Sequence, residues 1–77
     1  MPKIFEADGF SFFFYMNEHE PVHVHVRKQG KLAKFEIVNG TARPIFGKLS
    51  NADMAKAAAL ATEKSELIVR RWFEIFG

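Results

Sequence analysis

The sequence predicts an α+β domain: a meander of four to five antiparallel strands, with a C-terminal long, kinked or broken helix packed on one face. Two observations predict it. Asp-Gly, Gln-Gly and Asn-Gly pairs separate apolar runs up to Gly47, as two-residue hairpin turns do. All three Pro and all three His also precede Gly47, whereas helix-favouring Ala, Glu, Lys and Leu follow it. We therefore expect residues 1–77 to form a single domain, with a β half at 1–47 and a helical half at 48–77.

The first expected hairpin joins strands at residues 3–7 and 10–16 through Asp8-Gly9. Such a turn needs positive φ at both central positions, which Asp-Gly tolerates. The second strand barely alternates between apolar and polar residues, which predicts that it is covered on both faces or central in the sheet. A polar loop is expected at residues 17–21.

The second expected hairpin joins residues 22–27 and 31–38 around Gln29-Gly30. If Lys28 pairs with Lys31, apolar residues face apolar residues throughout, and a slip of one residue would destroy this match. The apolar pairs expected to face the helix are Val22–Ile37, Val24–Phe35 and Val26–Ala33; the pairs on the other face are His23–Glu36, His25–Lys34 and Arg27–Leu32. Asn39-Gly40 then leads to a fifth strand at residues 41–46, which Pro44 marks as a short edge strand.

The helical half begins at Ser50, a good N-cap with an acidic residue, Asp53, three positions later. An apolar stripe at steps of three and four follows, through Met54, Ala58, Ala61, Ser65, Ile68, Trp72 and Ile75, widened by Leu60, Leu67 and Phe76. One helix over residues 51–76 would be about 39 Å long, but a seven-residue strand spans only about 23 Å. The helix is therefore expected to overhang the sheet or to break near Thr62, which could cap a second helix.

Composition and charge exclude several classes of protein. The chain has no Cys, which excludes disulfides, thiolate nucleophiles and Cys-type zinc sites. It lacks an apolar run of roughly 18 residues and the pattern of a signal peptide, so we expect a cytoplasmic protein without a membrane partner. The net charge of +2 permits an acidic or nucleic-acid partner without demanding one.

One segment, residues 17–27, is unusual because it holds all three histidines. His19-Glu20-Pro21-Val22-His23 matches the zinc-protease motif His-Glu-x-x-His, but that motif requires a helix. Pro21 and the strand that follows it rule out the helix, so we reject this interpretation.

His23 and His25 lie two residues apart on a strand and should point to the same face. They could be metal ligands with His19, general acid–base groups, or anion contacts beside Arg27 and Lys34. They could also simply form the polar face of an amphipathic strand. We expect no metal and no cofactor, because two imidazoles leave a tetrahedral ion half coordinated and the nearby cations oppose it.

A basic run, residues 27–34, carries four cations and no acid at the expected hairpin tip. It could contact phosphates, or it could be a solvated turn whose lysines discourage pairing at the sheet edge. The rings of residues 12–15 could stack on bases, but a chain this small needs them in its core.

The chain resembles a group of small bacterial proteins known as domain-of-unknown-function family 4160. The resemblance rests on Met1-Pro2-Lys3-Ile4-Phe5, Asp8-Gly9-Phe10, Asn17-Glu18-His19-Glu20-Pro21-Val22-His23-Val24-His25-Val26, Ala33-Lys34-Phe35 and Trp72-Phe73-Glu74-Ile75-Phe76-Gly77. The family usually has a second proline where this chain has Val22. The resemblance implies a small stand-alone protein, in some cases a toxin–antitoxin component, and no agreed reaction. It also implies that Glu18, His19, Pro21, His23 and His25, which match its motif, belong to the site.

We therefore expect a small regulatory or toxin–antitoxin-like binding module. Its sheet face would bind a protein partner or nucleic acid through Glu18, His19, His23, His25, Arg27, Lys34 and Glu36. The alternative is a small hydrolase, a nuclease or phosphoesterase, that uses His23 and His25 directly or through a metal.

Overall fold

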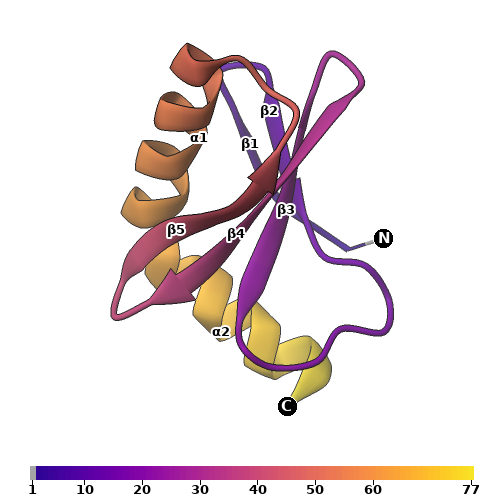
Figure 1. Ribbon diagram of the computed structural model, residues 1–77. Helices are drawn as coiled ribbons and strands as arrows, with labels where there is room; N and C mark the ends of the chain where they lie inside the picture. The colour runs from indigo at the N-terminus through magenta and orange to yellow at the C-terminus, as the bar shows by residue number, and fades with distance from the viewer. Residues whose placement is uncertain (1) are drawn as a thin grey trace.

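The computed structural model describes residues 2–77 and shows one five-stranded antiparallel sheet followed by two helices (Figure 1). Met1, the first residue of the expected domain, lies outside the described residues. The strands are adjacent in chain order, so the sheet is the expected meander and the α+β fold class is confirmed. The elements are β1 (Lys3–Ala7), β2 (Phe10–Phe13), β3 (His23–Lys28), β4 (Lys31–Val38), β5 (Thr41–Gly47), α1 (Asn51–Glu63) and α2 (Ser65–Phe76).

The three two-residue turns all form where the sequence predicts them. Their central residues all have positive φ, with values of 52° and 85° at Asp8-Gly9, 51° and 79° at Gln29-Gly30, and 51° and 78° at Asn39-Gly40. This backbone twist matches the right-handed twist of the flanking strands. The turns therefore place β1 beside β2, β3 beside β4 and β4 beside β5, whereas a longer loop joins β2 to β3.

The register between β3 and β4 is the predicted one. His23 is opposite Glu36, His25 opposite Lys34, and Val24 opposite Phe35. β5 is an edge strand, as Pro44 indicated, but with seven residues it is not short. An irregularity next to Lys34 makes Phe46 the cross-strand partner of that lysine. The pleat therefore separates a helix-facing set of residues from a set that faces away.

β2 is shorter than expected, because it ends at Phe13 and not at Met16. The backbone N–H of Phe14 donates a hydrogen bond to the carbonyl of Pro2 (2.9 Å), and the Phe14 ring packs edge-on against Trp72 with centroids 5.4 Å apart. Burial of this ring takes the chain out of the sheet. Residues 14–22 then form a loop that returns to the start of β3.

The helical half breaks close to the predicted place. The Ser50 hydroxyl accepts a hydrogen bond from the Asp53 backbone N–H, which confirms the predicted cap of α1. Lys64 separates α1 from α2 and forms no side-chain cap. Thr62 does not cap α2, because its hydroxyl instead accepts a hydrogen bond from the backbone N–H of Ala42 in β5 (2.9 Å).

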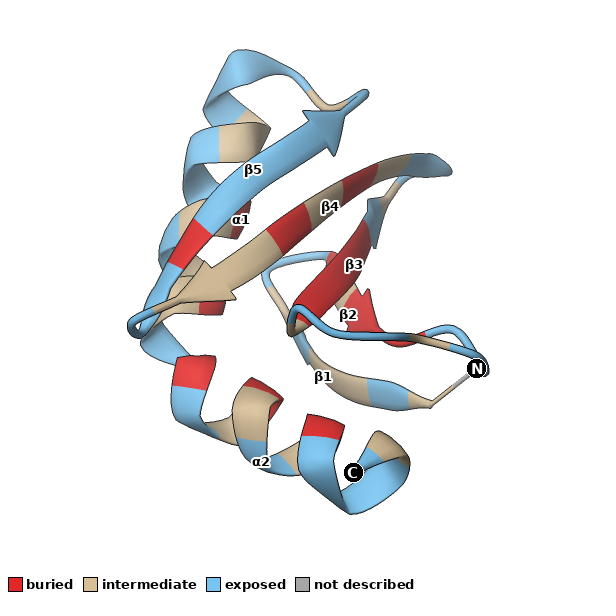
Figure 2. Ribbon diagram, turned by 60° about the horizontal axis from the view of Figure 1, so that its bottom comes forward, coloured by how far each residue is buried: buried red, intermediate tan, exposed pale blue. Residues whose placement is uncertain are grey.

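The core lies between the helices and one face of the sheet. In Figure 2, β3 is buried along much of its length, whereas the edge strand β5 is mostly exposed. The buried core residues are Phe10, Phe12, Phe14, Val24, Val26, Ala33, Phe35, Ala42, Ala57, Ala61, Ile68 and Trp72, with Val22 and Ile37 packed against them. Ser65, Ile68 and Trp72 of the predicted stripe are buried, but Ile75 departs from it: Ile75 is exposed, and Phe76, four residues after Trp72, packs against the core. Within residues 2–77, neither helix is long and apolar enough to cross a membrane.

Candidate functional site

The loop of residues 14–22 brings Glu18 against both strand histidines. One carboxylate oxygen of Glu18, Oε1, lies 2.8 Å from His23 Nε2, and the other, Oε2, lies 3.0 Å from His25 Nε2. We call Glu18, His23 and His25 the His–Glu cluster. All three are nearly closed to solvent, with side-chain exposures of 9%, 8% and 11% respectively. The cluster unites a loop residue with two strand residues that the pleat had already aligned.

The orientation of the cluster is set by backbone groups of the same loop. The carbonyl of Pro21 lies 2.9 Å from His23 Nδ1, and the backbone N–H of Tyr15 donates to Glu18 Oε2 at 3.0 Å. Both nitrogens of His23 therefore face an oxygen acceptor. A neutral imidazole carries only one N–H. When Nδ1–H donates to Pro21, a proton or another cation must lie between Nε2 and the Glu18 carboxylate.

Aromatic rings enclose the two imidazoles. The Tyr15 ring lies edge-on to His25 at 4.4 Å between centroids, and the Phe13 ring stacks on it at 5.7 Å. Trp72 of α2 lies 5.0 Å from His23, where the helix reaches the same end of β3 as the loop (Figure 1). The expectation that the histidines form an open polar face is therefore wrong: the loop and α2 cover them.

Burial and charge shift two of the pKa values in the cluster. Burial lowers the pKa of His25, and the negative charge of Glu18 only partly offsets this effect. Burial also raises the pKa of Glu18, but hydrogen bonds from Tyr15 and His23, with the charges of the two histidines, outweigh it and lower that pKa overall. Although His25 Nε2 is close to Glu18, the two are not aligned for a hydrogen bond, so this buried nitrogen has no hydrogen-bond partner.

The other four predicted site residues lie outside the His–Glu cluster. His19 is exposed on the loop. Glu36 is the cross-strand partner of His23, as predicted, but the hydrogen-bond partner of His23 is Glu18. Lys34 is half-buried beside His25. Arg27 is exposed, with its guanidinium carbon 5.1 Å from the centre of the Phe13 ring.

Arg27, Lys34 and Glu36 belong to the sheet face that is turned away from the helices, which we call the open face. One cross-strand row on this face spans all five strands through Lys3, Phe13, His25, Lys34 and Phe46. Arg27 and Ser11 lie on one side of this row, and Glu36 and Arg43 on the other. Lys3, Arg43 and Phe46 do not belong to the site that the sequence predicts. The turn at Asn39-Gly40 by itself pairs Arg43 with Glu36, whereas irregularities in the strand pairing put Lys3 opposite Phe13 and Phe46 opposite Lys34.

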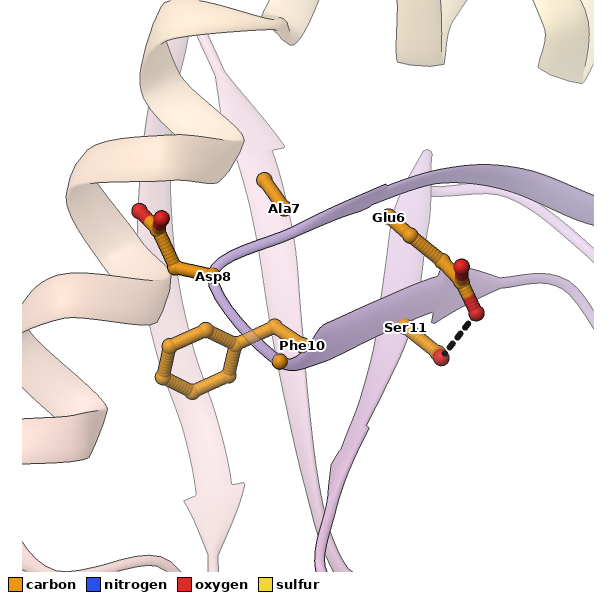
Figure 3. A pocket seen from close by; sticks show the side chains of 6 residues that line it. Glu6, Ala7, Asp8, Phe10 and Ser11 are labelled. Atoms are coloured by element: carbon orange, nitrogen blue, oxygen red, sulfur yellow. Dashed lines mark hydrogen bonds between the residues drawn. The ribbon is translucent and has the colours of Figure 1, made fainter.

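The first hairpin shows how the two faces separate. In Figure 3, Phe10 points toward α1, whereas Glu6 and Ser11 lie on the other side of the ribbon. Glu6 accepts hydrogen bonds from the Ser11 hydroxyl (3.0 Å) and the Lys3 ammonium (2.8 Å), and the hydrogen bond from Lys3 is the main cause of its lowered pKa. The hollow at this turn is lined by Asp8 as well, so its side chains do not suit an anionic ligand.

The basic run of residues 27–34 is divided between the two faces. The Lys28 ammonium binds Asp53 at the start of α1 (3.1 Å) and lies 4.6 Å from the centre of the Phe10 ring. Lys28 therefore joins the hairpin to the helix. Arg27 and Lys34 remain on the open face, and Lys31 is exposed at the tip.

Comparison with protein families gives one match. Residues 9–73 match the family described as Domain of unknown function (DUF4160), and this range includes the whole His–Glu cluster. No curated protein and no solved structure matches the chain.

Proposed function

The chain belongs to the DUF4160 family, which is a family of unknown function. From the geometry of the site we propose that the protein is a small binding module whose open face binds single-stranded nucleic acid. The regulatory, toxin–antitoxin-like setting implied by the sequence resemblance is part of the same proposal, as is a cytoplasmic location. An acidic protein surface is the competing partner, and the experiment below separates the two.

The observation that carries the proposal is a group of unpaired cations around an exposed ring. Among residues 2–77, Arg27, Lys34 and Arg43 form no ion pair with a carboxylate. Phe46, the cross-strand partner of Lys34, is 46% exposed although it is large and apolar. Cations that follow a phosphate backbone and an aromatic ring that stacks on bases are the two elements of single-strand binding.

The negative charges of the open face do not cancel these cations. Glu6 is hydrogen-bonded to Lys3, and Glu18 is buried between the histidines. Glu36 is the remaining acid, and it lies between His23 and Arg43 in the register. The face therefore retains an excess of positive charge, which favours a polyanion.

The burial of the histidines favours binding over direct catalysis. A general acid or base must come within hydrogen-bond distance of the proton that it transfers. His23 and His25 are only 6% and 8% exposed, and the loop side chains cover them. The hydrolase alternative therefore has less support than recognition by the outer side chains.

Fluorescence anisotropy with labelled single-stranded RNA and DNA tests the proposal. We expect binding that weakens as salt increases, with a logarithmic slope of about −0.7 for each phosphate contact. The triple variant Arg27→Ala/Lys34→Ala/Arg43→Ala removes three such contacts, so its slope should be smaller in magnitude by about 2. Phe46→Leu should weaken binding without changing the slope. Arg70→Ala, which removes an exposed cation from α2, is the matched control and should bind like the wild type.

Two results would contradict this function. The first is equal affinity of the wild type and the triple variant for both nucleic acids. The second is salt-dependent binding to an acidic polypeptide, such as polyglutamate, with no binding to either nucleic acid; this result would assign the face to a protein partner.

A further inference from the structure

We propose that the His–Glu cluster, Glu18, His23 and His25, is a binding site for a divalent transition-metal ion of the Zn²⁺ type. Each residue offers one ligand atom, and the three atoms lie within 4.8 Å of one another. The expectation of no metal depended on the lack of a third ligand next to the two histidines. The loop supplies that ligand as Glu18, in place of His19.

The separations in the cluster are close to those around a small ion, and a small adjustment of Glu18 would bring the ligand atoms to metal-binding distances. Zinc bonds of about 2.1 Å at tetrahedral angles place neighbouring ligand atoms about 3.4 Å apart. The Glu18 oxygens lie 2.8 Å from His23 Nε2 and 3.0 Å from His25 Nε2. One ligand atom from each of the three residues lies within 4.8 Å of the others. A shared ion would therefore need the Glu18 oxygens to move outward by a few tenths of an ångström and the more distant ligand atoms to approach one another, with Glu18 moving on its loop.

The hydrogen bonds that His23 and Glu18 make to backbone groups resemble those of metal ligands in other proteins. Metal-bound histidines commonly donate their second N–H to a backbone carbonyl, which fixes the tautomer that exposes the other nitrogen to the ion. His23 has this arrangement, with Nδ1 2.9 Å from the Pro21 carbonyl and Nε2 directed at Glu18. The Tyr15 N–H likewise orients the carboxylate. An ion between the three residues would also give the buried His25 Nε2 the partner that it lacks.

The ligand set determines which class of ion fits. Two imidazoles and one carboxylate suit Zn²⁺ and neighbouring transition metals, whereas Ca²⁺ and Mg²⁺ require oxygen ligands. Lys34 beside His25 opposes a cation, but the Glu18 carboxylate coordinates directly and is close enough to compensate for that charge. The site therefore selects Zn²⁺-type ions over Ca²⁺ and Mg²⁺, because two of its three ligand atoms are imidazole nitrogens.

A metal here would fasten the loop to the sheet. Glu18 lies in the loop of residues 14–22, and both histidines lie in β3. Because Phe13, Tyr15 and Trp72 surround the imidazoles, a large substrate cannot reach the ion in this conformation. The metal would therefore have a structural role, and its loss would loosen the loop beside the open face.

Isothermal titration calorimetry of untagged, chelator-treated protein at pH 7.5 tests the site. We expect Zn²⁺ to bind at one ion per chain with micromolar or tighter affinity, and millimolar Ca²⁺ and Mg²⁺ to give no heat. Glu18→Gln and His25→Ala should each weaken zinc binding more than tenfold. His19→Ala removes an exposed histidine from the same loop and should leave the affinity unchanged, which separates the site from adventitious binding by a surface imidazole.

A second measurement, on the wild-type protein, tests the site even if the variants fail to fold. In the wild-type protein, zinc should shift the imidazole NMR signals of His23 and His25 and leave that of His19 in place. Zinc binding that persists in folded Glu18→Gln, or that disappears in His19→Ala, would overturn the proposal. So would the absence of zinc binding by the wild type. None of these readouts involves nucleic acid, so the site and the proposed function can fail independently.

Discussion

Replacing Trp72 by Ala removes the largest of the fully buried side chains, which is 1% exposed. Its ring lies against His23, Phe14 and Phe76, with centroid separations of 5.0, 5.4 and 4.8 Å. A change from Trp to Ala in a core costs about 3–5 kcal/mol, because the transfer free energy is lost and a cavity remains. The three aromatic contacts place the expected loss toward the upper end of that range.

This loss is large relative to the stability of so small a domain. At 0.05–0.15 kcal/mol per residue, a chain of this length has a free energy of unfolding of about 4–12 kcal/mol. Phe73→Ala is the matched control, because the neighbouring Phe73 side chain is 49% exposed. Half-burial of a Phe contributes about 1 kcal/mol, so this variant should lose no more than that amount.

Urea unfolding followed by far-ultraviolet circular dichroism measures both variants. Tryptophan fluorescence is unsuitable, because Trp72 is the only tryptophan and the variant lacks it. A loss below about 1 kcal/mol for Trp72→Ala, or a loss equal to that of Phe73→Ala, would refute the packing of α2 on the sheet.

Thr62→Val removes the acceptor of the Ala42 N–H while keeping the side-chain shape, so thermal or urea unfolding should show a loss of about 1–2 kcal/mol. Thr41→Val, at an exposed position, should be nearly neutral. In EDTA-treated protein, stability should fall as pH drops from 6.5 to below 4.5. Burial lowers the pKa of His25, and hydrogen bonds outweigh burial to lower that of Glu18. The unfolded chain therefore binds protons first, and folding is favoured at higher pH. Equal urea midpoints at pH 7 and pH 4 would contradict this reasoning.

The local features of the fold could be predicted from the sequence because each depends on residues close together in the chain. Asp8-Gly9 and Gln29-Gly30 adopt positive φ wherever a hairpin needs it. Alternation on β3 and β4 excludes a slip of one residue, and the two-residue turn at Gln29-Gly30 selects the register that is observed. The cap at Ser50 follows from its own side chain and from Asp53, three residues away. Such local signals predict the strands and helices and the pairing of the strands. They therefore also predict the face of the sheet to which His23 and His25 point.

The candidate site depended on contacts that no local pattern encodes. The loop of residues 14–22 has no periodicity, and its path follows from the burial of Phe14 against Trp72, far away in the chain. That path brings Glu18 to His23 and His25, which alternation alone had placed on an open polar face. The sequence by itself determined the strands, their turns and their register, because these follow from short-range backbone preferences and side-chain alternation. The tertiary structure alone decided which carboxylate meets the histidines and that they are buried, because loop conformation is selected by long-range packing of the whole core.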